Sequence, residues 1–342
     1  MTKVLLTGGS GFIAAHVLET LLQRGHSVVT TVRSQDKAKK IHDAHPSIGK
    51  DKLETLIVPD IAKEGAFDEV VKTPGLEAVL HTASPFHFKI NDPQKDLIDP
   101  AVIGTTGILK AITKSAPGVK RVVITSSFAA ILDKDKITDP NATFTEKSWN
   151  PVTIDEIHES PAIAYRASKK LAEKAAWDYV QAGAGFDLVT VNPPMVFGPV
   201  VHYLASLDAI NTSNERFVSL VQGGWRNSEN KIPDTGVNIW VDVRDVALAH
   251  VLAIEKPELA GRRLFTTAGY YSNREILDAA RKNFPELADK FPAEGATGGE
   301  PIPADKTFKF DNSETTKALG FQWTTLETTT SDTLKSLIPF LK

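Results

Sequence analysis

Tyr165 and Lys169 lie four residues apart in a segment whose pattern predicts a helix over residues 163–182, so their side chains share one helix face. A free phenol titrates near about pH 10, and an adjacent ammonium favours its deprotonated form and so makes it a stronger acid. A donor whose pKa lies closer to the working pH is a better general acid. The pair therefore indicates a group that protonates an oxygen, although most pairs with this spacing lie on solvated helix faces.

Three hydroxyl side chains, Thr125, Ser126 and Ser127, follow one another at the end of a predicted strand over residues 120–125. The carboxyl ends of parallel strands are where α/β sheets bind ligands. A hydroxyl at that edge can hydrogen-bond a substrate oxygen and orient it towards Tyr165. Alternatively, the hydroxyls cap the segment that follows, and the two roles can fall to different members of the trio.

A glycine-rich turn follows the first predicted strand. Residues 9–14 match the pattern G-x-G-x-x-G/A, with Ala14 in the last position, and the turn stands between a strand and a helix as that pattern requires. Glycine lets the backbone come close to a pyrophosphate, and the helix N-terminus offers free N–H groups and a partial positive charge. Two glycines in such a turn could also serve backbone geometry alone.

The end of the second predicted strand indicates which dinucleotide binds. NAD-binding folds usually place an acidic residue there to hold the ribose 2′-hydroxyl, but residues 30–33 contain no carboxylate. Arg33 instead offers a guanidinium suited to a 2′-phosphate, and Lys37 lies one helical turn beyond it. We therefore predict NADPH rather than NADH. The alternative is that Arg33 is a surface residue paired with Asp36.

These features together predict an NADPH-dependent oxidoreductase that reduces aldehydes or ketones. A hydride would reach the carbonyl carbon while Tyr165 protonates the oxygen, one of the three hydroxyls holds that oxygen, and Lys169 supports Tyr165 and binds ribose. The reverse oxidation is chemically allowed.

Two other functions stay open from sequence. A sugar-nucleotide epimerase or dehydratase would retain NAD and bind a diphosphate through basic residues of the second lobe; candidates are Arg216, Arg226, Arg262 and Arg263. A dinucleotide sensor without catalytic activity ranks last, because such proteins often lack the pair of Tyr165 and Lys169.

Alternating strands and helices must position these residues. The predicted strands cover residues 3–7, 27–32, 53–59, 76–81, 120–125 and 186–192, and the helices 12–24, 35–44, about 100–115, and 163–182. Apolar strands that are each followed by a helix predict an α/β fold, a Rossmann-type doubly wound parallel sheet. After residue 198, strands are expected at 239–241 and 263–267, helices at 211–221, 244–254 and 273–283, and a loop at 291–306, and most of this part forms a smaller C-terminal α/β substrate lobe. We expect an NADP-binding domain over residues 1–198, rejoined by about 237–260, and a mainly substrate-binding lobe over 199–342.

The composition excludes several classes. The 342 residues carry 39 Lys and Arg against 42 Asp and Glu, a net charge of −3, which gives no basic excess for nucleic acid or an anionic membrane. The absence of cysteine excludes disulfides, thiolate metal sites and cysteine nucleophiles. The glycine turn follows the first strand too soon for a signal peptide, and no window approaches the roughly 18 apolar residues of a membrane helix. We expect a soluble cytoplasmic protein.

These motifs resemble those of the extended short-chain dehydrogenase/reductase family. Within it, the chain is most similar to the NADPH-dependent methylglyoxal/isovaleraldehyde reductases and dihydroflavonol-4-reductase-like enzymes, over nearly the whole length. The segments that carry the resemblance are residues 7–14, 32–37, 81–86, 125–127, 165–169, 192–199, 211–213 and 241–246.

The resemblance implies that Ser127, Tyr165 and Lys169 form a catalytic trio. It implies cofactor contacts from Gly8, Gly9, Ser10, Gly11, Phe12 and Ile13 at the pyrophosphate, Arg33 and Lys37 at the 2′-phosphate, Asp60 and Ile61 beside the adenine, Thr82, Ala83 and Ser84 with Tyr165 and Lys169 at the nicotinamide ribose, Val196 with Pro193 at the carboxamide, and Ser213 from the lobe. Relatives relay protons behind the lysine through an Asn or a water, and this chain offers no residue that we can assign to that role. Relatives include monomers and homodimers.

Apolar residues near the predicted active edge suggest a hydrophobic substrate cleft. The candidates are Phe86, Phe128, Met195 and Tyr203, with Trp225 weaker, and each considered alone is more often a core residue. They imply apolar or aromatic aldehydes, ketones and keto esters as substrates. We expect no metal site, a structural role for His81, and capping roles for Asp242 and Asp245 at a helix N-terminus.

Overall fold

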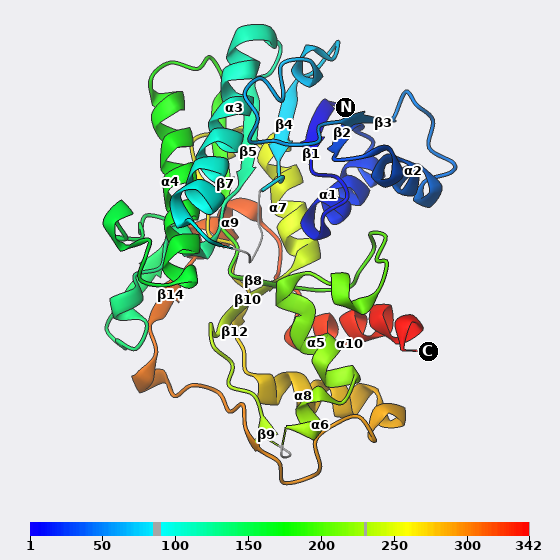
Figure 1. Ribbon diagram of the computed structural model, residues 1–342, viewed down its shortest axis with the longest axis vertical. Coiled ribbons are helices and arrows are strands. Elements are labelled where there is room, and N and C mark those ends of the chain that lie inside the picture. Colours follow the sequence, from blue (N-terminus) through cyan, green and yellow to red (C-terminus); the bar gives the residue numbers. More distant parts are fainter. Residues whose placement is uncertain (85–89, 229–230, 342) are drawn as a thin grey trace.

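The computed structural model describes residues 1–84, 90–228 and 231–341. Its centre is a seven-stranded parallel sheet in the order β11-β7-β5-β4-β1-β2-β3 (Figure 1). The strands are β1 (Lys3–Thr7), β2 (Ser27–Val32), β3 (Leu53–Ile57), β4 (Ala78–His81), β5 (Arg121–Thr125), β7 (Asp187–Val191) and β11 (Arg263–Leu264). Most of their residues are buried because helices cover both faces, so the predicted doubly wound Rossmann-type fold is confirmed.

Alternate residues of each strand face opposite helix layers. Val4 and Leu6 pack with one layer, whereas Leu5 packs with the other. The first layer contains α1 (Phe12–Gln23), α2 (Gln35–Ala44) and α7 (Val243–Glu255), and the second contains α3 (Asp99–Ser115) and α4 (Pro161–Gln181) (Figure 1).

A second apolar core lies in the lobe, drawn below the main sheet in Figure 1. It contains a three-stranded sheet of β12 (Gly269–Tyr270), β10 (Ile239–Asp242) and β8 (Met195–Phe197), and a two-stranded sheet of β13 (Thr297–Gly298) and β9 (Lys231–Ile232). The lobe helices are α5 (Glu215–Val221), α6 (Gly224–Asn227), α8 (Asn273–Asn283) and α10 (Leu326–Leu337). A further pair of strands, β6 (Thr143–Thr145) and β14 (Lys309–Asp311), and helix α9 (Ser313–Leu319) complete the main elements.

The main differences from the predicted elements lie in the second half. The predicted strand over residues 263–267 is only two residues long, and the helix predicted over 211–221 begins as a 3₁₀ turn (Thr212–Asn214) before α5. Strand β8 and helices α9 and α10 were not predicted. Helix α7 follows lobe strand β10 but packs on α1, beside the main sheet. The boundary near residue 198 stays a prediction.

The strand order determines which loops meet. The segments after β7, β5, β4 and β1 lie side by side along one edge of the sheet, because those strands are neighbours and parallel. That edge brings together residues that are far apart in sequence: Asn192, Ser127, Ser84 and the glycine turn. Within the described residues, we find no helix whose length and apolarity would let it span a lipid bilayer.

Candidate functional site

Helix α4 carries Tyr165 and Lys169 to this edge. The Ser160 hydroxyl caps the helix by accepting from the Ile163 N–H at 3.2 Å. Tyr165 and Lys169 are both half-buried, and the Lys169 Nζ lies 5.9 Å from the centre of the Tyr165 ring. The same ammonium donates to the Ser84 Oγ at 3.1 Å, so it joins the helix to the segment that follows β4.

The three hydroxyls after β5 have separate partners. Thr125 Oγ1 lies 2.7 Å from His250 Nε2; because His250 Nδ1 bonds the Val246 carbonyl, Nε2 accepts and Thr125 donates. Ser126 donates to the buried Glu173 carboxylate. Ser127 Oγ accepts from the Ala129 N–H at 3.1 Å and caps a 3₁₀ turn (Phe128–Ala130) that packs against α4.

The glycine turn leaves no space for side chains. Gly8 has φ = +76°, and a Cβ there would come within 3.1 Å of the Ala83 Cα. A Cβ on Gly9 would overlap the Thr30 side chain. Gly11 caps α1 without a side-chain hydrogen bond, so the first N–H groups of the helix have no side-chain acceptor. These features fit a dinucleotide pyrophosphate, since the close approach and the exposed N–H groups are what such a group needs.

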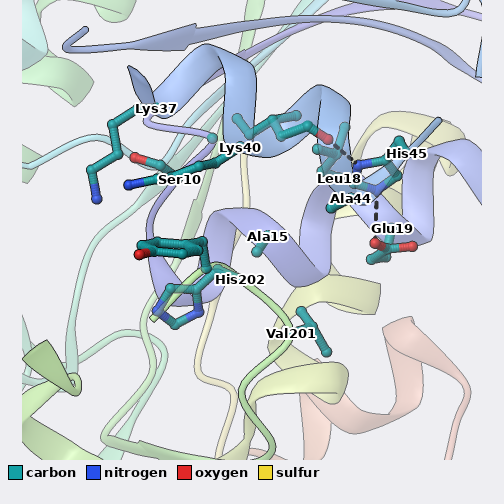
Figure 2. A pocket seen from close by; sticks show the side chains of 13 residues that line it. Ser10, Ala15, Leu18, Glu19, Lys37, Lys40, Ala44, His45, Val201 and His202 are labelled. Carbon is teal, nitrogen blue, oxygen red and sulfur yellow. Dashed lines mark hydrogen bonds and ion pairs between the residues drawn. The ribbon is translucent and has the colours of Figure 1, made fainter. Parts of the chain in front are cut away.

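Basic side chains gather beside this turn. Arg33 is exposed, and Asp36 accepts from Lys40 at 2.7 Å rather than from Arg33. Figure 2 shows Lys37 and Lys40 extending from α2 towards Ser10 of the glycine turn. Ser10, Lys37 and Lys40 line a cavity of about 40 Å³. A 2′-phosphate bound at the end of β2 would need positively charged side chains, and Arg33, Lys37 and Lys40 would supply them.

Residues from the lobe side close this cavity. Lys40 Nζ lies 3.8 Å from the centre of the Tyr203 ring. His202 lines the same cavity (Figure 2), and its Nδ1 is buried with no hydrogen-bond partner in the described part of the chain. Burial first, then the nearby His16 and Lys37, lowers the pKa of His202 to about 4.

His81 supports the site structurally. Its Nδ1 lies 2.9 Å from Thr7 Oγ1 at the end of β1, and its side chain is buried. Burial first, and then the charge of Lys169, lowers the pKa of His81 to about 4, so the ring is neutral near pH 7.

The segment from Thr82 to Ser84 packs against the glycine turn. Thr82 Oγ1 donates to the Thr7 carbonyl at 2.5 Å, and the Ala83 N–H donates to Thr7 Oγ1 at 3.1 Å. Asp60 is exposed, and its carboxylate accepts from the Ala62 N–H. The segment over residues 82–84 is therefore held beside the glycine turn.

Residues expected near the nicotinamide lie where the chain enters the lobe. The Pro193 carbonyl accepts from the Phe128 N–H at 2.8 Å, and Val196 is buried within β8. Ser213 lies in the 3₁₀ turn before α5, which Asn214 fastens to the Gly198 carbonyl at 2.9 Å. These positions agree with the expected contacts but do not by themselves test them.

The expected substrate cleft is revised at two positions. Phe128 is 3% exposed and packs against Phe144, Phe265 and Phe308, so its surroundings are those of a core residue. Tyr203 lies over Lys40, beside the glycine turn.

Met195 is half-buried on β8 and stays a candidate for the cleft. Trp225 is buried in the lobe core. Phe86 lies outside the described residues. Asp242 caps α7 as expected, whereas Asp245 accepts from Thr324 instead of capping.

The contacts among three polar residues beside the site, Glu173, Asn192 and Arg263, were not predicted. Glu173 accepts from Asn192 Nδ2 and from Arg263 Nε, both at 2.6 Å. The one sequence signal for Glu173 was its spacing, one helical turn after Lys169 on the same face of the helix.

Comparisons with known proteins agree with this arrangement. Residues 4–265 match the NAD dependent epimerase/dehydratase family. The chain belongs to this family. The match and the relatives below confirm the resemblance to extended short-chain dehydrogenases/reductases.

Family members resemble the chain over almost its whole length. It is 44% identical to the ketoreductase azaE of Aspergillus niger, over 98% of this chain and 97% of that protein. It is 39% identical to the NADPH-dependent methylglyoxal reductase GRE2 of Saccharomyces cerevisiae, over 99% and 98% of the two chains. Among solved structures of the family, Gre2 of Candida albicans in complex with NADPH matches with a TM-score of 0.89 and 34% identity, over 100% of both chains.

Proposed function

We propose that this protein is an NADPH-dependent carbonyl reductase, an oxidoreductase that reduces aldehydes and ketones. The single observation that carries the proposal is the meeting of Tyr165 and Lys169 on α4 with Ser127 and the glycine turn at one sheet edge. The reductases of known activity that resemble the chain over their full length support it.

Tyr165 donates a proton to the carbonyl oxygen of the substrate, and Ser127 orients that oxygen. Ser127 suits this role because its Oγ accepts a backbone N–H, which fixes the oxygen and leaves its own proton for the substrate. Lys169 lies beside the Tyr165 ring and holds the Ser84 hydroxyl, so it fixes the distance between α4 and β4.

The residues around the glycine turn would hold NADPH, and the chemistry that the reduced nicotinamide supplies when bound is a hydride. Gly8 and Gly9 let the backbone approach the pyrophosphate, and the N-terminus of α1 faces it. Arg33 and Lys37 would bind the 2′-phosphate, with Lys40 beside them. The absence of an acid at the end of β2 favours a 2′-phosphate over a 2′-hydroxyl.

The substrate would enter between the sheet edge and the lobe. Met195 on β8 and Phe86 stay our candidates for an apolar wall, which favours apolar or aromatic aldehydes, ketones and keto esters. We also propose that the enzyme works in the cytoplasm, where a reduced NADPH pool favours reduction over oxidation. We propose that it works as a monomer or homodimer.

A sugar-nucleotide epimerase is less well supported. All four arginines considered for a diphosphate have other partners. Arg226 donates to the Asp289 carbonyl, Arg262 to the Glu258 carbonyl and Arg263 to Glu173. Arg216 is half-buried and donates to Asn273. A likeness to a UDP-glucose 4-epimerase from Thermotoga maritima, at 18% identity, concerns the fold alone.

One assay tests the proposal. Purified protein is mixed with NADPH or NADH and a panel of aldehydes, diketones, keto esters and bulky ketones, and cofactor absorbance is followed. We expect turnover with NADPH at a higher kcat/KM than with NADH. No turnover of any carbonyl, combined with tight NADPH binding, would favour the dinucleotide sensor instead.

A further inference from the structure

Glu173 has an unusual position for a carboxylate. It lies on α4 one turn after Lys169 and two turns after Tyr165, and its side chain has no solvent exposure. Five side chains donate to it: Ser126, Trp177, Thr190, Asn192 and Arg263. These donors come from the ends of β5 and β7, from β11 and from α4 itself. One carboxylate therefore fastens the helix of the proton donor to three strands.

Two of these contacts lead directly to Ser127. Ser126, its neighbour in the chain, donates its hydroxyl proton to Glu173. Asn192 Nδ2 donates to Glu173 at 2.6 Å and also lies 3.3 Å from the Ser127 carbonyl. The carboxylate thus holds the backbone on which Ser127 is placed, from two sides.

The charge of Glu173 is balanced by a guanidinium that is itself held in place. Arg263 donates from Nε to Glu173 and from Nη1 to the Glu146 and Ser148 carbonyls, and its guanidinium carbon lies 3.9 Å from the centre of the Trp149 ring. Buried ion pairs add little net stability because desolvation offsets their attraction. A role in fixing geometry therefore explains this pair better than a role in stability.

Glu173 also borders the space behind the ammonium. Lys169, Ser84 and Glu173 line one cavity of about 20 Å³, on the sheet side of the helix. Any rotation of α4 or shift along its axis would thus move Tyr165, Lys169 and Glu173 together relative to the strand ends.

We propose that Glu173, held by Arg263, is a positioning residue that sets the separation of Tyr165 on α4 from Ser127 after β5. The proposal rests on the carbonyl reductase function proposed above. Proton donation and oxygen binding must act on the same atom at once, and a misplacement of about 1 Å can cost on the order of 100-fold in rate. The hydrogen bonds of Glu173 oppose such a misplacement, because they hold α4 against the ends of the strands.

The test compares Glu173→Gln and Ser126→Ala with a control, Glu255→Gln. Glu255 is a partly buried glutamate, and its carboxylate accepts from Arg24 and His26, which precede β2 and so lie at the opposite edge of the sheet. For each protein, one measures the melting temperature, the NADPH dissociation constant by fluorescence, and kcat per NADPH-binding site with protiated and C4-deuterated NADPH.

We expect kcat to fall roughly 10- to 100-fold in Glu173→Gln and about 3- to 10-fold in Ser126→Ala, with a full primary deuterium isotope effect. The NADPH dissociation constant should stay within about threefold of the parent value, since these residues do not line the phosphate cavity. Glu255→Gln should lower the melting temperature while it keeps the parent kcat and isotope effect.

The proposal is overturned if Ser126→Ala keeps the parent kcat, or if Glu173→Gln loses kcat only in proportion to lost NADPH binding. If Glu173→Gln does not fold, the Ser126→Ala result decides alone, because that variant leaves the carboxylate with four other donors. A parent protein that reduces no carbonyl would instead refute the proposed function, before any variant is compared.

Discussion

The two ends of the proposed cofactor site are built differently. At the nicotinamide end, Glu173 is fully buried, Arg263 is 10% exposed, and hydrogen bonds to Glu173 join three strands to α4. At the phosphate end, Arg33 is exposed and Tyr203 is 53% exposed. Long cationic side chains there extend from the first turns of α2 (Figure 2).

This difference follows from what each end must do. Proton and hydride transfer depend on the positions of particular atoms, so the residues involved are held by directional, buried contacts. Attraction between a phosphate and a cation falls slowly with distance and tolerates mobile side chains. Variants at the nicotinamide end should therefore change kcat, and variants at the phosphate end should change the apparent affinity for NADPH.

The largest expected effect comes from Tyr165→Phe, which keeps the ring and removes the acidic proton. We expect kcat to fall roughly 10²- to 10⁴-fold, the usual contribution of a general acid, with little change in NADPH affinity. Tyr179→Phe is the matched control, because Tyr179 lies on the same helix and donates only to Thr113. If Tyr165→Phe reduced aldehydes at the parent rate, Tyr165 would not be the proton donor.

The next largest effect is expected at the phosphate end. Arg33→Ala and Lys37→Ala should each raise the KM for NADPH about 10- to 100-fold, since each removes a hydrogen bond to a charged group, and should leave the KM for NADH unchanged. Lys39→Ala is the control, because Lys39 lies on the same helix but pairs with Asp43 on its exposed side. Equal losses with both cofactors would place these cations away from the 2′-phosphate.

The nicotinamide end was the more predictable of the two. Its strands are continuous apolar segments, so their parallel order and the positions of Ser127, Tyr165 and Lys169 at one edge follow from local patterns. Glu173 was missed because its partners come from three strands, and their convergence is a property of the tertiary fold.

The packing between distant segments, in the lobe and beside it, was less predictable. Phe128 belongs to a cluster completed by residues 144, 265 and 308, and nothing near it in sequence indicates those neighbours. Strand β8 is three residues long and follows two prolines, so it is too short to show the alternation of apolar and polar residues that predicts a strand. Tyr203 was expected near the substrate, and the structure places its ring against Lys40 of α2, a contact that nothing in the local sequence indicates.

A smaller effect should appear in how the stability of the protein depends on pH, and most of it comes from the buried, nicotinamide end. His81 and His250 are buried, and burial lowers the pKa of each to about 4, whereas the ordinary value is about 6.5. Between these values the unfolded chain binds more protons, so both residues favour the folded state fully above about pH 6.5 and lose that contribution as the pH falls through 4. Each contributes at most about 1.4 kcal/mol per pH unit.

Asp245 opposes this trend, because burial raises its pKa to about 6 and its contribution is lost as the pH rises through that value. These two histidines, together with His202, whose pKa burial also lowers to about 4, outnumber it, so the melting temperature should fall between pH 7 and pH 5. His250→Gln removes one titrating group and should make that slope shallower, as calorimetry at several pH values would show. A slope unchanged in His250→Gln would mean that the ring is charged in the folded protein.

The smallest expected effect decides between two roles for Tyr203. Its ring lies 3.8 Å from Lys40 Nζ and is half-exposed, an arrangement that typically contributes about 0.5–1 kcal/mol. Tyr203→Ala should therefore raise the KM for NADPH only about two- to fivefold, and Tyr203→Phe, which keeps the ring, should stay near the parent value. If Tyr203 instead lined the substrate cleft, the alanine variant would change the ranking of bulky ketones and leave the KM for NADPH unchanged. Measuring both constants on the same three proteins separates these roles, and a shift confined to the substrate would remove Tyr203 from the phosphate end and weaken the contrast between the two ends.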